Sequence, residues 1–147
     1  MSKRFDLGDI DTVKAANKGF DVELYHPSTE EDTGIFITVL GKDSDEFQKI
    51  SRQQNKKRID RMTKNGFRPN KATPSQEELD ANGLELLAAC TIGWKTIDGD
   101  EEKDTILFNG EELNFSVGAA KKLYTERPWV KEQVDIAIGD RANFIKA

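Results

Sequence analysis

Two stretches between residues 20 and 40 constrain the fold most, because both have the residue pattern of β-strands. Residues 20–25 alternate apolar and polar side chains, which is the period of a strand with one buried face. Residues 35–40 form a run rich in β-branched side chains and bounded by Gly34 and Gly41, which is typical of a buried strand. We therefore predict two strands that pair antiparallel across the polar loop between them.

A long helix is predicted over residues 43–64, and apolar residues are scarce in it. Cap-type and acidic residues at its start favour helix initiation. After Phe47 and Ile50 no apolar residue appears until Ile59, and this step turns the apolar stripe to the other side of the helix. Such a helix cannot pack against a core along its whole length.

The rest of the chain is predicted to be mainly helical. Helix-start signals precede apolar residues at helical spacing at Pro74, Ser116 and Pro128. The Asn109-Gly110 pair favours a tight turn between two short strands, and residues 93–97 have the pattern of a further strand. The expected class is α+β, with an N-terminal β-hairpin and short helices followed by a predominantly helical C-terminal part that holds a small second hairpin.

The length of 147 residues suits a single domain spanning 1–147. The segment 65–73 is the only plausible linker, and the alternative is a hinge there between an N-terminal α/β part and a helical C-terminal part. Charged residues make up 33% of the chain, above the roughly 25% of an average domain, so much of the surface must be solvated. No signal peptide and no membrane span are expected, and a single cysteine fits a reducing cytoplasm.

Candidate catalytic side chains are few. The chain has one histidine, His26, expected in an exposed loop, and one cysteine, Cys90, expected on the apolar face of a helix. The acidic turn 98–104 alternates carboxylates as a calcium loop does, but Lys103 and Asn109 stand where that loop needs glycine and glutamate. We therefore predict a protein that is not an enzyme and has no metal or cofactor.

Basic residues accumulate in the second half of the long helix. A nucleic-acid interface needs such a patch, usually interleaved with aromatic residues, and here only Phe67 follows the pattern. The net charge of −5 also argues against general nucleic-acid binding. A solvated face, or one that meets an acidic partner or the next subunit, is the preferred interpretation. The residues of this basic face are Arg52, Lys56, Lys57, Arg58 and Arg61.

The order of several weak motifs resembles the small tail assembly proteins of long-tailed bacteriophages, the tail assembly chaperone family. Residues 20–24 and 41–47 match the first half of that pattern, residues 86–94 lead into the second half, and residues 113–116 and 128–144 complete it. The resemblance spans nearly the whole chain and lies in order and spacing, since no single motif is diagnostic.

This resemblance implies a function. Such chaperones hold the long, helical tape measure protein in solution in the host cytoplasm until the tail tube forms around it, and they are generally absent from the finished virion. The implied partners are the tape measure protein and further copies of the chain, with the tail tube protein as an additional alternative. A structural tail component is the second hypothesis, and a nucleic-acid-binding protein is the third.

A tape measure chaperone needs an apolar surface that covers amphipathic helices. The apolar stripe of the last helices is the candidate for that surface, although ordinary core packing is the competing explanation for each of its residues. The candidate residues are Leu123, Tyr124, Trp129, Val130, Val134, Ile138 and Phe144.

Overall fold

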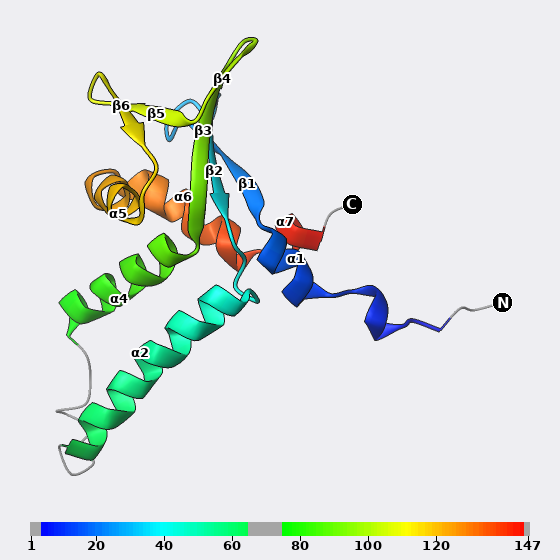
Figure 1. Ribbon diagram of the computed structural model, residues 1–147, viewed down its shortest axis with the longest axis vertical. Helices are drawn as coiled ribbons and strands as arrows, with labels where there is room; N and C mark the ends of the chain where they lie inside the picture. Colours follow the sequence, from blue (N-terminus) through cyan, green and yellow to red (C-terminus); the bar gives the residue numbers. More distant parts are fainter. Residues whose placement is uncertain (1–3, 65–74, 146–147) are drawn as a thin grey trace.

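The computed structural model describes residues 4–64 and 75–145, which form an α+β fold around an antiparallel sheet (Figure 1). The sheet has four strands in the order β1-β2-β3-β4. Their bounds are Phe20–Tyr25, Asp32–Val39, Thr91–Asp98 and Glu101–Lys103. The predicted fold class and the antiparallel pairing of the two N-terminal strands are confirmed.

The pairing of the third strand with the N-terminal strands is the main feature of the sheet that the sequence does not predict. Residues 93–97 were expected as a strand of the C-terminal half, yet β3 pairs along β2, with Ile37 opposite Trp94 and Ile35 opposite Thr96. Strands from both halves of the sequence therefore share one sheet. The acidic turn contributes β4, which pairs with the end of β3.

The predicted second hairpin is confirmed. It consists of β5 (Thr105–Phe108) and β6 (Glu111–Asn114), which pair antiparallel. Asn109 and Gly110 form the two-residue turn with φ values of 53° and 81°. Positive φ at both positions is what the tight hairpin turn requires, and asparagine and glycine tolerate it best.

Three helices, α1, α4 and α5, begin at side-chain caps that the sequence predicts. Asp11, Ser75 and Ser116 each accept a hydrogen bond from a backbone N–H in the first turn of the helix that follows. Pro74 and the segment 65–73 lie outside the described residues. The helices are α1 (Thr12–Lys18), α2 (Asp45–Lys64), α4 (Gln76–Ala89), α5 (Val117–Glu126), α6 (Pro128–Gly139) and α7 (Ala142–Ile145).

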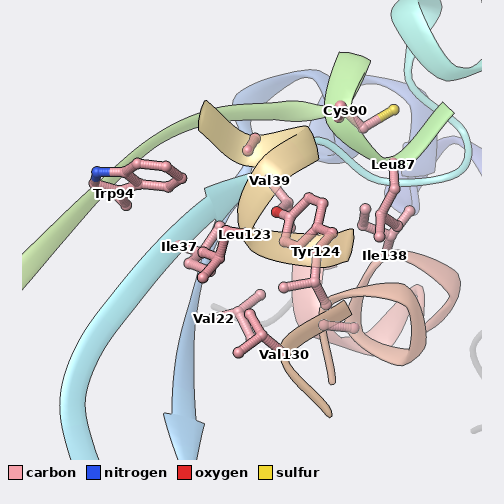
Figure 2. Close-up of a cluster of buried hydrophobic side chains, with 14 of the residues drawn as sticks. Val22, Ile37, Val39, Leu87, Cys90, Trp94, Leu123, Tyr124, Val130 and Ile138 are labelled. Atoms are coloured by element: carbon pink, nitrogen blue, oxygen red, sulfur yellow. The ribbon is translucent and has the colours of Figure 1, made fainter. Parts of the chain in front are cut away.

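One hydrophobic core joins the sheet to the helices α4, α5 and α6 (Figure 2). Val22 and Ile37 supply it from the sheet, while Leu87 and Val134 supply it from the helices. Tyr124 lies inside it with 1% of its surface exposed. Its side chains come from both sides of the segment 65–73.

Helix α2 differs from the others because none of its residues is buried. Figure 1 shows it projecting from the sheet beside α4, as the scarcity of apolar residues predicts. Its first turn is anchored, since the Ser44 hydroxyl accepts from the Phe47 N–H and the Asn17 side chain of α1 bonds Asp45. In the described part of the chain no helix is both long and apolar enough to cross a bilayer.

Candidate partner-binding grooves

The first groove lies between the edge strand β1 and helix α6. Its volume is about 260 Å³, and it has a largely apolar lining. Ile136 is 65% exposed and Tyr25 is 44% exposed, so two large apolar side chains face solvent beside it. We call this surface the α6–β1 groove; its lining residues are Phe20, Val22, Glu23, Tyr25, Gln133, Ile136, Ala137 and Asn143.

A side-chain amide fixes this groove. The Gln133 Oε1 accepts from the Tyr25 N–H at 3.1 Å, and the Gln133 Nε2 donates to the Tyr25 carbonyl at 3.0 Å. Gln133 thus pairs with the edge strand much as a neighbouring strand would. The two bonds hold α6 at a fixed place along β1.

Most of the predicted partner-binding residues belong to the core. Five of the seven, namely Leu123, Tyr124, Val130, Val134 and Ile138, are at most 4% exposed. Their assignment to an open surface is wrong in this structure, because these side chains pack into the hydrophobic core that the sheet shares with α4, α5 and α6. Trp129 and Phe144 are half-buried, and Phe144 packs edge-on against Phe20 with ring centroids 5.9 Å apart.

Ile136 is the exposed residue that the sequence analysis missed. It lies on α6 between Val134 and Ile138, off the buried stripe, and it is exposed while both of these neighbours are buried. An apolar residue outside a helix's core-facing stripe is the signal that identifies it.

The second groove lies between α2 and α4, and most of its lining residues are polar or basic. Its volume is about 450 Å³. The Gln54 Nε2 donates to the Asn82 carbonyl at 2.8 Å, and Arg61 forms an ion pair with Glu78. We call it the α2–α4 groove; it is lined by Ser51, Gln54, Asn55, Lys57, Arg58, Arg61, Glu78, Leu79, Ala81 and Asn82.

The structure divides the predicted basic face. Lys57, Arg58 and Arg61 line the α2–α4 groove. Arg52 and Lys56 are exposed and do not line it; they are four residues apart and so share another side of the helix. Within the ranges 4–64 and 75–145, Lys57 and Arg58 form no ion pair.

The two reactive side chains that the sequence singled out have structural surroundings. The His26 Nδ1 accepts hydrogen bonds from the Ser28 and Thr29 N–H groups, both at 3.1 Å, and so shapes the loop after β1. Cys90 is fully buried, and burial raises the pKa of its thiol to about 12. The thiolate, which is the nucleophilic form, is therefore scarce at neutral pH.

The acidic turn carries no metal-type cluster in the described structure. There, no group of three or more His, Cys, Asp or Glu side chains is placed to hold an ion. Instead, the Lys95 Nζ lies 3.3 Å from a carboxylate oxygen of Asp21 on β1 and 3.6 Å from a carboxylate oxygen of Glu102 in the turn.

Comparisons of the chain with known protein families, curated proteins and solved structures found no match.

Proposed function

We propose that the protein is a non-enzymatic tail assembly chaperone of a long-tailed bacteriophage, which binds the tape measure protein and keeps it in solution in the host cytoplasm. The α6–β1 groove is the observation that carries the proposal. The resemblance described above, which extends over nearly the whole chain, supports the same function.

The groove suits the apolar face of an amphipathic helix. Ile136 and Tyr25 provide exposed apolar surface, and the half-buried Phe20 lies in the lining. Covering one such side chain contributes about 1.5–3 kcal/mol when burial is complete. A contact of this size is weak for a single site, so a long partner is held at many places and each contact remains easy to break. A chaperone that must later release its partner needs this distribution.

The basic residues support the nucleic-acid alternative less well. They lie on different sides of α2, and the Arg61 charge is already paired with Glu78. The described part of α2 offers no aromatic side chain beside Arg52 or Lys56 on which a base could stack.

Co-expression with the tape measure protein of the same genome tests the proposal. The tagged chain should retain a tape measure protein that is insoluble when expressed alone, and light scattering should give the stoichiometry. Ile136→Asp places a charge in the groove and should reduce retention about tenfold or more. Leu107→Asp is the matched control, because Leu107 is 67% exposed on β5, away from the groove.

Two results would count against the proposal. The first is a folded, soluble chain that retains no tape measure protein; if such a chain is also abundant in purified virions, a structural tail component becomes the better hypothesis. The second is equal loss of retention in Ile136→Asp and Leu107→Asp, which would move the contact away from the α6–β1 groove.

A further inference from the structure

The segment before α1 keeps large apolar side chains in water. We call residues 4–11 the N-terminal arm. Phe5 is 73% exposed, Leu7 is 82% exposed and Ile10 is 46% exposed. Figure 1 shows the arm extending away from the body, on the opposite side of α2 from α4. Such a concentration of exposed apolar surface in one short segment is typical of a segment that binds another surface.

The arm has a defined local conformation. It contains one turn of 3₁₀-helix, η1 (Leu7–Asp9), in which the Asp6 carboxylate accepts from the Gly8 N–H at 2.9 Å. At its end the Asp11 carboxylate accepts from the Lys14 N–H at 2.9 Å and caps α1. These bonds reduce the conformational freedom that the arm would lose on binding.

The charges of the arm complement one surface of the same protein. The arm carries three aspartates, Asp6, Asp9 and Asp11, against the single arginine Arg4. Lys57 and Arg58 of the α2–α4 groove have no ion-pair partner among the described residues. Each groove has one carboxylate in its lining, but that of Glu78 in the α2–α4 groove is paired with Arg61, whereas Glu23 in the α6–β1 groove forms no ion pair among the described residues and would repel the arm.

The α2–α4 groove also offers room and apolar contact. Its volume of about 450 Å³ lies within the range of roughly 300–1,000 Å³ that is usual for binding pockets. Leu79 is 49% exposed at its wall, and Ala81 lies beside it. A large apolar side chain such as Leu7 would find an apolar partner there, next to the charged groups of Lys57 and Arg58.

We propose that the N-terminal arm of one copy binds the α2–α4 groove of a second copy. Because arm and groove lie on opposite sides of α2, each copy gives its arm to one neighbour and its groove to another. Such a head-to-tail contact builds a ring when the rotation closes and an open chain when it does not. The contact is small and charged, so the association is concentration-dependent and weakens with added salt.

Sedimentation of the chain alone tests the arm and the groove separately, with no tape measure protein present. Leu7→Asp disables the arm, and the pair Lys57→Glu and Arg58→Glu disables the groove. Each should weaken self-association at least about tenfold. The control is the pair Arg52→Glu and Lys56→Glu, which makes the same charge change outside the groove and should leave association within about twofold. All altered residues are exposed, and circular dichroism checks that each variant is folded.

A mixing experiment identifies the geometry. The Leu7→Asp chain retains its groove, and the groove variant retains its arm. Mixed together, they should form a one-to-one dimer that grows no further, although neither associates alone. A contact between identical patches on two copies would give no such complementation.

Three results would overturn the proposal. The first is a wild-type chain that stays monomeric at every concentration. The second is self-association that Leu7→Asp leaves unchanged, which would show that the arm serves a different occupant. The third is a control pair that weakens association as much as the groove pair, which would reduce the effect to general charge repulsion. None of these results bears on the binding of the tape measure protein at the α6–β1 groove.

Discussion

Removing the hydroxyl of Tyr124 should destabilise the protein through one buried hydrogen bond. The Thr91 hydroxyl donates its only proton to the Leu87 carbonyl at 2.9 Å, so at the 2.7 Å contact between Thr91 Oγ1 and the Tyr124 hydroxyl it is the tyrosine that donates. Thr91 is 2% exposed and Tyr124 is 1% exposed, so water cannot replace the lost donor. Tyr124→Phe should therefore lower the free energy of unfolding by about 1–2 kcal/mol.

Urea unfolding followed by tryptophan fluorescence measures this change. The midpoint should fall while the slope m stays the same, and Tm should fall by about 2–8 °C for a chain of this length. Tyr25→Phe is the matched control: Tyr25 is 44% exposed, so its change should stay within about 0.5 kcal/mol.

A double-mutant cycle with Thr91→Val isolates the bond itself. The combined loss of unfolding free energy for Tyr124→Phe and Thr91→Val should be smaller than the sum of the single losses by about 1 kcal/mol, because each single substitution already removes the hydrogen bond that the two side chains share. Additive losses, or a Tyr124→Phe variant as stable as the wild type, would refute the assignment of this bond as a stabilising contact.

Three further predictions concern stability and reactivity. Burial raises the pKa of the Cys90 thiol from 9.0 to about 12, so the unfolded chain releases this proton more readily than the folded chain. The contribution of the buried thiol to the free energy of unfolding should therefore be complete below pH 9 and fall between pH 9 and 12. At pH 8 a thiol reagent should react with Cys90 only after unfolding. Gly41→Ala should lower the free energy of unfolding in urea by about 1–3 kcal/mol, because the added Cβ would lie 2.9 Å from the Ala16 Cβ of α1. The contrasting variant is Gly83→Ala in α4, where the added Cβ meets nothing within 4 Å and should raise the free energy of unfolding by up to about 1 kcal/mol. The hydrogen bond from Arg141 lowers the pKa of Asp43, so this pair's contribution to stability should be complete above pH 3.8 and be lost as the pH falls from there through the lowered pKa. In acid titrations Asp43→Asn should remove that step.

Local signals in the sequence were sufficient for most elements of the fold. Side-chain caps such as Ser116, the turn pair Asn109-Gly110 and the alternating pattern of residues 20–25 act over a few residues, and each element appears where it was predicted. The second neighbour of β2 in the sheet could not be found in this way, although the pairing of β2 with β1 was predicted. The pairing of β2 with β3 depends on packing between residues far apart in the chain, such as Ile37 and Trp94, and periodicity carries no information about that choice.

The binding surface was harder to predict than the fold, for a physical reason. An apolar helical stripe looks the same in sequence whether it faces a core or a partner, and here the sheet covers Val130 and Val134. Only residues outside that stripe, such as Ile136, remain available. The charges of α2 were likewise visible in the sequence. Which of them line the groove depends on where α4 packs, and only the structure shows that Lys57 lines it and Arg52 does not.

The bonds of Gln133 to Tyr25 also have a consequence for synthesis on the ribosome. They join residues 108 positions apart, so a nascent chain makes β1 early and receives the side chain that pairs with its edge only when α6 emerges. Until then the open edge of β1 is a template for pairing with other chains. Folding of this sheet is therefore completed late, and chains truncated before residue 128 should aggregate through their first strand.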